Sequence, residues 1–392
     1  MQEFTARRAE AAAWPGKQPS GNRRRNRLLG FACAAAAVLS LLASDGLLRA
    51  AALVSAGLAL PQGAGRLLYP AADEAAGEAT QPALAVTPEQ KIILADTKSF
   101  DLRATPKDIE VLMEEALSEF AGQKRDGDIR AKTYTARDAT HAWGKLAVRN
   151  TTQSQPGRDI SKDLAAPIGL KLDKSKPAVL IFHTHTTEGF EILDRPWYAA
   201  DWSSRTENGA KSIVRVGEEM AKTLERAGWR VIHDTNIYDR QYTGAYDKSR
   251  AAVLKHLEEN PSILVTLDVH RDAIHTDKGV HIKPLAQVGG KNAAQVMIIT
   301  GVREGAIAGY ESWEENLRFA AKLQVAAEER YPGLMRPIFF APRRYNMDVT
   351  PYSLLLEMGA DANTLEEAVY SGRLIGDVLA KLLEQFAMNN EQ

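Results

Sequence analysis

The sequence predicts an α/β fold in which a mixed, mostly parallel sheet carries helices on both faces. Two observations predict this fold. Short, wholly apolar runs alternate with stretches of helical periodicity through residues 178–386, as in sheets whose strands are covered on both sides. The helix ends are also marked, because Gly228 follows one periodic stretch and Thr364 with Glu367 forms a capping box that opens the last one.

The elements follow one another in a regular order. Strands are expected at residues 178–182, 229–233, 262–270, 295–300 and 353–357. Helices are expected at residues 213–227, 251–257, 313–329 and 364–386, and a weaker helical pattern covers residues 109–120. In open sheets of this kind, ligands bind beyond the carboxyl ends of the strands.

The N-terminal part of the sequence indicates a membrane anchor. Four arginines between residues 23 and 27 precede an apolar run at residues 28–43, and a second Ala- and Leu-rich run follows Arg49. A full span needs about 20 residues, so the first run alone is short. Together the two runs are typical of a span, a re-entrant segment or a signal sequence. We expect a retained anchor, because no convincing cleavage site follows, and the arginines place the rest of the chain outside the cell membrane.

Composition divides the rest of the chain and limits its partners. Residues 1–69 are expected to form a cytoplasmic tail and anchor, residues 70–90 a linker rich in Ala, Glu and Pro, residues 91–145 an extracytoplasmic N-terminal region, and residues 146–392 the α/β domain. The net charge of −1 gives no electrostatic reason to expect a nucleic-acid partner. Cys33 is the only cysteine, so a metal site would have to use histidines and carboxylates.

Three of the most apolar strands end in ionisable residues. These are His183, His185 and Glu188 after the first strand, Asp268, His270, Arg271 and Asp272 at the second, and Glu357 at the third. Because the carboxyl ends of such strands meet at one edge of a sheet, we expect a shared metal site there. Catalytic zinc takes three protein ligands and a water, whose pKa falls to about 7. Glu357 is the spare carboxylate that could relay the proton.

Each motif alone has an ordinary structural explanation. If the strand continues through His183 and His185, both point to one face, and the ordinary explanation is that one of them only forms a hydrogen bond to its neighbour. The aspartates beside Arg271 could form a structural ion pair. The conjunction of three polar strand ends favours the metal site. His275 and His281 follow in a glycine-containing loop, where we expect ordinary structural residues rather than substrate contacts.

The motifs also resemble a known family. The stretches "VLIFHTHTTEGF", "SIVRVGEEMAKTLERAGWRVIHD", "AYDKSR", "LDVHRDAI", "YPGLMRPI", "RYNMDVTP" and "LLLEMGADANTLEEA" resemble stage II sporulation protein P over about residues 145–385. The resemblance implies a catalytic domain similar to zinc N-acetylmuramoyl-L-alanine amidases. Such an enzyme would use Zn²⁺ to cleave peptidoglycan between the lactyl group of muramic acid and L-alanine. The resemblance also implies an endopeptidase activity on peptide cross-links. It also implies an anchored protein that acts in the septal wall during engulfment, with stage II sporulation proteins D and M as partners.

The resemblance implies roles for individual residues. His185 matches the first zinc-binding histidine, with His183 as an alternative or additional ligand, and His270 matches the second. Glu357 matches the catalytic glutamate. Glu188 is the stronger candidate for the carboxylate ligand, and Glu207 is the alternative.

A substrate contact and two departures complete the comparison with the family. Arg271 is expected to orient an acidic group of the stem peptide. Met347 stands where the family commonly has glutamine, and Tyr352 where it commonly has glycine. Neither position carries the chemistry.

Two other functions fit parts of the pattern. The H-x-x-E pair is similar to that of zinc carboxypeptidases, which would release free amino acids. A non-catalytic scaffold would bind the cell wall without turnover. A metallo-β-lactamase lacks support, because no D-H pair follows the H-x-H motif.

Overall fold

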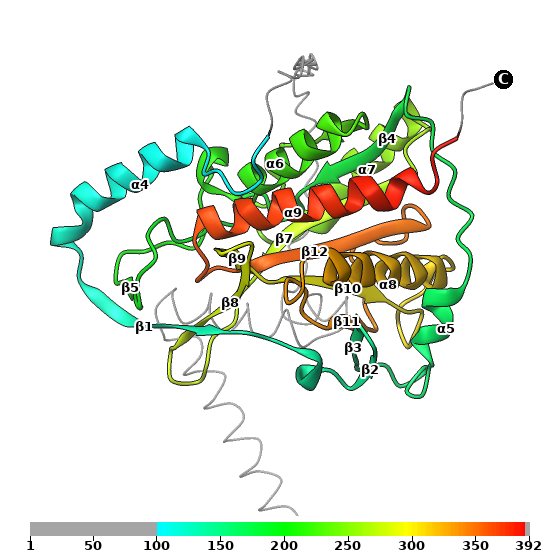
Figure 1. Cartoon of the computed structure of the whole chain (residues 1–392), viewed down its shortest axis with the longest axis horizontal. Helices are drawn as coiled ribbons and strands as arrows, with labels where there is room; N and C mark the ends of the chain where they lie inside the picture. The colour runs from blue at the N-terminus through cyan, green and yellow to red at the C-terminus, as the bar shows by residue number, and fades with distance from the viewer. Residues whose placement is uncertain (1–99, 389–392) are drawn as a thin grey trace, which may run out of the picture. The chain divides into compact units, whose positions relative to one another are not determined.

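An eight-stranded sheet forms the centre of the part of the chain that the structure, a computed structural model, describes: residues 100–388 (Figure 1). The strand order is β2-β3-β11-β10-β12-β7-β4-β6. The strands are β2 (His141–Trp143), β3 (Leu146–Asn150), β4 (Pro177–Phe182), β6 (Arg230–His233), β7 (Val265–Asp272), β10 (Val296–Gly301), β11 (Ile338–Ala341) and β12 (Tyr352–Ala360). All neighbours run parallel except β2–β3 and β10–β12, so the prediction of a mixed, mostly parallel sheet is confirmed.

Helices cover both faces of this sheet, as the sequence predicted. The helices are α4 (Lys107–Glu119), α5 (Ile160–Ala165), α6 (Ile213–Arg226), α7 (Ala245–Glu259), α8 (Trp313–Arg330) and α9 (Leu365–Glu384). Side chains alternate along β4, and this alternation separates the two faces. Val179 and Ile181 belong to the core that includes Val216 of α6, whereas Leu180 and Phe182 pack with Val253 of α7. The predicted capping box of Thr364 and Glu367 is present at the start of α9.

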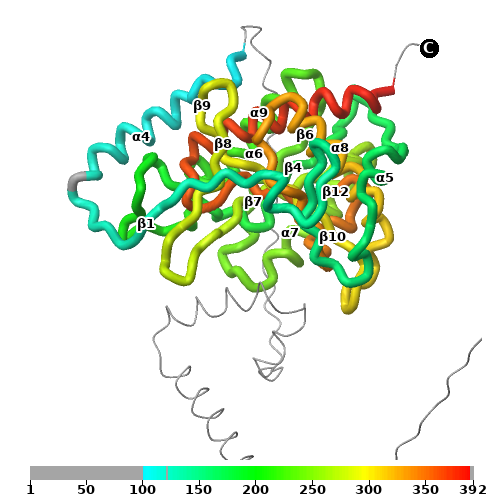
Figure 2. Tube along the Cα trace, turned by 60° about the horizontal axis from the view of Figure 1, so that its bottom comes forward, coloured from blue at the N-terminus to red at the C-terminus, as the bar shows by residue number. Residues whose placement is uncertain are grey.

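A second sheet was not predicted. It has four strands in the order β5-β1-β8-β9, with bounds β1 (Arg125–Lys132), β5 (Trp197–Ala199), β8 (His281–Val288) and β9 (Lys291–Ala294). β1 and β8 lie on the same side of the view in Figure 2, and residues 129–132 pair in parallel with residues 281–284. Short 3₁₀ turns lie at Phe120–Gly122, Ala136–Asp138 and Gly209–Lys211.

The expected domain organisation falls partly outside the described residues. The anchor at residues 1–69 and the linker at residues 70–90 lie outside them, and none of the helices within residues 100–388 is both long and apolar enough to span a membrane. The expected division after residue 145 falls inside the β2–β3 hairpin, in which Ala142 pairs with Ala147. Residues 107–145 thus contribute strands to both sheets.

The middle of the large sheet positions the polar residues that end its strands. β12, β7 and β4 are adjacent and parallel, so their carboxyl ends lie at one edge. Glu357 is the register partner of His270, and Ala360 that of Asp272. β12 therefore carries one extra residue, a bulge, and Gly359 within it has a φ of 80°.

Candidate active site

The carboxyl ends of β4, β7 and β12 bring together most of the residues expected at a metal site. The turn after β4 carries His185 and Glu188, and β7 carries His270. The ring centroids of His185 and His270 are 5.4 Å apart, with an angle of 86° between the ring planes. His270 Nδ1 lies 3.4 Å from Glu188 Oε2. Glu357 lies opposite His270 on the neighbouring strand.

His185 is suited to bind a metal ion. Its side chain is buried, and its Nδ1 has no hydrogen-bond partner among the described residues. One face of the ring stacks on Tyr242, with 4.6 Å between the ring centroids and 5° between the planes. Burial lowers the pKa of His185 to about 4, so the imidazole is neutral at physiological pH, which is the form that coordinates metals.

Glu188 and His270 form a buried pair of opposite charge. Burial would raise the pKa of Glu188, but His270 and Arg271 outweigh it and hold this pKa well below its usual range. The Arg271 backbone N–H donates to Glu188 Oε2 over 3.1 Å. Burial would lower the pKa of His270, but Asp268 and Glu188 outweigh it and hold this pKa well above its usual range. The carboxylates of Glu188 and Asp268 thus lie on the two sides of the His270 ring, one near each ring nitrogen.

Asp268 is a site residue whose role the sequence did not indicate beyond an ion pair. Its Oδ1 lies 2.7 Å from His270 Nε2, an ion-pair distance without the alignment of a hydrogen bond. The backbone N–H and the hydroxyl of Thr184 both donate to its carboxylate. A fixed carboxylate behind a metal-binding histidine sets the ring orientation. Asp268 and His270 are two residues apart on β7, so strand alternation was the signal that could have paired them.

Glu357 is a half-buried residue whose carboxyl group has an unusual proton affinity. Its Oε2 has no hydrogen-bond partner within residues 100–388. Burial, and then the neighbouring Asp272 carboxylate, raise the pKa of Glu357 to about 8. A carboxyl with a pKa near neutral can both accept and donate a proton, as a general acid–base group must.

His183 does not join this cluster. Its Nδ1 lies 2.8 Å from the carbonyl oxygen of Val269, and its Nε2 lies 2.9 Å from His233 Nε2. The side chain is fully buried beneath α6, where a Cβ on Gly217 would lie 2.6 Å from His183 Cε1. Both ring nitrogens are thus occupied by protein groups, which favours His185 over His183 as the metal ligand.

Two other residues expected at the site, Glu207 and Arg271, have side chains that pair with other groups of the protein. Glu207 is exposed and pairs with Arg240, with 3.1 Å between Oε2 and Nε, so the geometry favours Glu188 as the carboxylate ligand. Arg271 is buried, and its guanidinium donates to the carbonyl oxygens of Gly189 and Ser204. Its donors thus hold the backbone beside the site.

A cation that the sequence did not indicate lies at the rim of the site. The Arg205 side chain is 36% exposed, and its Nη2 lies 3.8 Å from Glu188 Oε1. Its Nη1 pairs with Asp239 over 2.5 Å, and its guanidinium lies over the Tyr242 ring. No sequence motif distinguishes Arg205, because its position depends on a long loop after β4.

The chemical types of these donors suit a divalent cation. The first donor is His185, a neutral imidazole whose Nδ1 has no hydrogen-bond partner among residues 100–388. The others are the Glu188 carboxylate and His270, which lies between the carboxylates of Glu188 and Asp268. Two histidines and one carboxylate are a common set of protein ligands for catalytic zinc. Glu357 adjoins these ligands and remains available for proton transfer.

Several known proteins are similar to this chain. A family model described as Stage II sporulation protein P (SpoIIP) matches residues 93–380. The stage II sporulation protein P of Bacillus subtilis (strain 168) is 28% identical over 219 residues, which cover 53% of this chain and 51% of the relative. The match thus spans about half the length of that curated relative.

Two solved structures are similar to about half of this chain, at low identity. N-acetylmuramoyl-L-alanine amidase AmiC2 of Nostoc punctiforme has 13% identity and a TM-score of 0.32, over 54% of this chain and 99% of that chain. The CwlD amidase from Clostridioides difficile, in complex with the GerS lipoprotein, has 12% identity and a TM-score of 0.31, over 53% and 97%. Similarities this low do not bear on the chemistry of this chain.

Proposed function

Because the chain belongs to the stage II sporulation protein P family, we propose that it is a zinc-dependent peptidoglycan hydrolase. The bond cleaved is the amide between the lactyl group of N-acetylmuramic acid and L-alanine, and peptide cross-links are a second target. The observation that carries the proposal is the convergence of His185, Glu188, His270 and Glu357 at adjacent strand ends.

The proposed metal ligands are His185, Glu188 and His270. A zinc ion bound there would supply a water that ionises near neutral pH and would polarise the amide carbonyl. Asp268 contacts Nε2 of His270, and the backbone N–H and hydroxyl of Thr184 donate hydrogen bonds to the Asp268 carboxylate. This chain of contacts supports the proposal, because ligands fixed in advance cost little to organise on binding.

Glu357 is the proposed general acid–base group. It takes the proton that the attacking water loses and delivers that proton to the nitrogen of the leaving amine. Its burial and its raised pKa, about 8, suit a carboxyl that must hold a proton between these two events. Its place opposite His270 puts it beside the proposed ligands.

Arg205 is the proposed contact for an acidic group of the stem peptide. It is the partly exposed cation beside Glu188, whereas Arg271 directs its side-chain donors to backbone carbonyls. We therefore transfer to Arg205 the substrate role that the sequence suggested for Arg271. A charge-assisted hydrogen bond to a carboxylate is among the stronger polar contacts that a rim can offer.

The cellular setting is part of the proposal and rests on the resemblance to the family and on the N-terminal sequence. We propose that an anchor within residues 1–69 confines the enzyme to the wall beside its membrane. There it would degrade septal peptidoglycan during engulfment, with stage II sporulation proteins D and M as partners.

Mass spectrometry of the fragments released from purified sacculi tests the proposed cleavage. With Zn²⁺ added, the full chain is expected to release stem peptides that begin with free L-alanine and to leave free lactyl groups on the glycan. His270→Ala and Glu357→Gln should lose this activity, and His141→Ala, at the far edge of the sheet, should keep it. Release of single amino acids would instead indicate a carboxypeptidase, and binding without turnover would indicate a scaffold. Activity surviving in both site variants would overturn the mechanism.

A further inference from the structure

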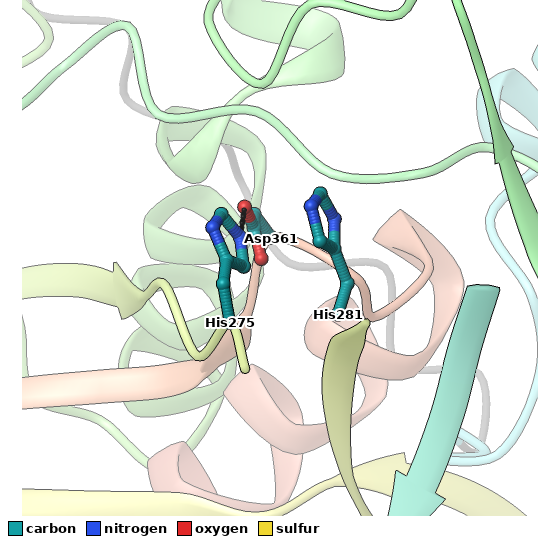
Figure 3. Close-up of side chains that lie close together, drawn as sticks. All are labelled: His275, His281 and Asp361. Atoms are coloured by element: carbon teal, nitrogen blue, oxygen red, sulfur yellow. Dashed lines mark hydrogen bonds and ion pairs between the residues drawn. The ribbon is translucent and has the colours of Figure 1, made fainter. Parts of the chain in front are cut away.

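A second group of metal-binding side chains lies outside the site described above. His275 belongs to the loop after β7, His281 begins β8, and Asp361 follows β12 (Figure 3). One ligand atom from each of the three lies within 4.8 Å of the other two. The group therefore joins the carboxyl edge of the large sheet to the start of a strand in the second sheet.

Polar atoms in this group are buried without partners. His281 Nδ1 and Asp361 Oδ1 have no hydrogen bond to any residue that the structure describes. The other oxygen of Asp361, Oδ2, lies 2.8 Å from His275 Nε2. Buried polar atoms in proteins are nearly always paired, so two unpartnered atoms on neighbouring residues of one cluster point to a missing ligand.

The surroundings fix His281 and leave His275 room to turn. The His281 ring lies between those of Tyr198 and His275, with centroid distances of 3.9 Å and 3.8 Å. The His275 side chain is 42% exposed. Burial, and then the neighbouring His275, lower the pKa of His281, which favours the neutral imidazole that binds metals.

A second buried acidic residue, Glu191, interacts electrostatically with Asp361. Glu191 Oε2 pairs with Arg195, but Glu191 Oε1 has no hydrogen-bond partner between residues 100 and 388. Burial is the main cause that raises the pKa of Glu191 to about 7, and the Asp361 charge contributes in the same direction. A cation bound by Asp361 would relieve this repulsion between carboxylates.

We propose that His275, His281 and Asp361 bind a divalent transition-metal ion of the zinc class, separately from the ion proposed for His185, Glu188 and His270. Imidazole and carboxylate ligands suit zinc and its neighbours rather than calcium or magnesium. With metal–ligand bonds of about 2.1 Å, tetrahedral ligand atoms lie about 3.4 Å apart. The planes of the His275 and His281 rings are 10° from parallel, and each nitrogen lone pair lies in the plane of its ring. The two lone pairs therefore do not meet at one point, and binding of a shared ion requires the exposed His275 ring to tilt towards the other two ligands.

Such an ion would tie together three segments. The Asp361 backbone N–H already donates to the carbonyl oxygen of Asp272 over 2.9 Å, and the His275–His281 backbone bridge closes the loop between them. The ion would add a link from this loop to the end of β12. We therefore expect zinc to raise the thermal stability of the protein through this site, independently of catalysis.

Zinc stoichiometry tests the second site. The full chain, purified in mild detergent, is loaded with Zn²⁺, passed over a desalting column and measured by inductively coupled plasma mass spectrometry. We expect two equivalents in the wild type and one in each of His281→Phe, which keeps a stacked ring, and Asp361→Asn, which keeps the shape. His256→Phe is the matched control and should retain two, because His256 also contacts an aspartate, Asp234, over 3.0 Å but has no third ligand among the described residues.

The outcomes separate this proposal from the proposed function. Loss of one equivalent in His185→Ala and of the other in His281→Phe supports both sites. A wild type that binds one equivalent, lost only in His185→Ala, overturns the second site and leaves the hydrolase intact. One equivalent that is lost only in His281→Phe supports the second site and contradicts the zinc chemistry proposed at His185. Circular dichroism of each variant confirms folding, and a melting temperature that zinc raises in His185→Ala but not in His281→Phe provides an independent measure.

Discussion

Glu357 lies directly opposite His270 in the parallel pairing of β12 with β7. Register partners on adjacent strands are about 5 Å apart and project to the same side of the sheet. The distance between the proposed acid–base group and a proposed metal ligand is therefore set by backbone pairing. A loop movement cannot change it without disrupting the sheet.

Glu357→Gln is expected to reduce turnover by roughly 10²- to 10⁴-fold, because the amide cannot relay a proton. Zinc content should not change, since Glu357 is not a proposed ligand. Release of dye from labelled sacculi measures the rate. Glu207→Gln is the control, because Glu207 is an exposed glutamate paired with Arg240. Full activity in Glu357→Gln would show that Glu357 is not the general acid–base group.

His183 and His185 should respond to substitution in opposite ways. His183→Ala removes the contacts to Val269 and His233, and we expect the free energy of unfolding to fall by about 2–4 kcal/mol while the folded protein keeps its zinc. His185→Ala should lose one zinc equivalent and change the stability of the metal-free protein less. Urea denaturation and metal analysis provide the two measurements. A folded His183→Ala protein without zinc at this site would show that His183 is a ligand.

Gly217→Ala should destabilise the protein, because a Cβ there would lie 2.6 Å from His183 Cε1 and 2.7 Å from His233 Nε2. Overpacking of this kind typically costs about 1–3 kcal/mol. Gly209→Ala is the matched control, since the atom nearest to its Cβ would be Val214 Cγ1 at 3.5 Å, an ordinary contact. Thermal denaturation compares the two variants. Equal melting temperatures would mean that α6 can move away from the histidine pair.

Asp234 should make the stability of the protein depend on acidic pH. Burial would raise its pKa, but hydrogen bonds from His256, Tyr238 and Asn236 hold this pKa at about 2. A folded-state pKa below the unfolded value stabilises the protein above about pH 4, and this contribution is lost as the pH falls towards 2.

Asp234→Asn should therefore lower the free energy of unfolding by about 2 kcal/mol at pH 7, and the difference from the wild type should shrink below pH 4. Urea denaturation at pH 7, 4 and 3 measures this trend. Glu258→Gln, at an exposed position on α7, serves as the control and should show little effect. A difference that does not vary with pH would exclude the charge of Asp234 as its source.

Arg205→Gln should weaken substrate binding by about 10- to 100-fold, as expected for the loss of a hydrogen bond between charged groups. The change should appear mainly in KM for soluble muropeptides. Arg205→Lys tests whether charge alone suffices, because lysine keeps the charge but loses the paired geometry. Arg240→Gln, with a more exposed arginine, is the control. An unchanged KM in Arg205→Gln would assign substrate recognition elsewhere.

The strand ends could be predicted because burial on both faces leaves a strong signal. β4 is apolar throughout, and β7 is buried along almost its whole length, as expected for parallel strands that are covered on both faces. β1 gave no such signal, since most of its residues are exposed and polar. Its pairing with β8, more than a hundred residues away, depends on tertiary contacts that no local pattern encodes.

The choice between the two histidines after β4 could not be made from sequence. It depends on where β4 ends, at Phe182, and on a partner for His183 supplied by β6, His233. The same holds for His275 and His281, which were expected to be ordinary structural residues. They are close to Asp361 only because β8 begins beside the end of β12.

The bulge in β12 has a consequence for how this protein could evolve. Residues 357 and 361 would project to the same side of an unbroken strand. The extra residue shifts the alternation by one place, and Gly359 permits it, because a Cβ there would lie 2.6 Å from Asn363 Oδ1 and its φ is left-handed. Glu357 and Asp361 thus belong to two different proposed sites, although both lie at the end of β12. Substitutions at one site can therefore be selected without changing the ligands of the other.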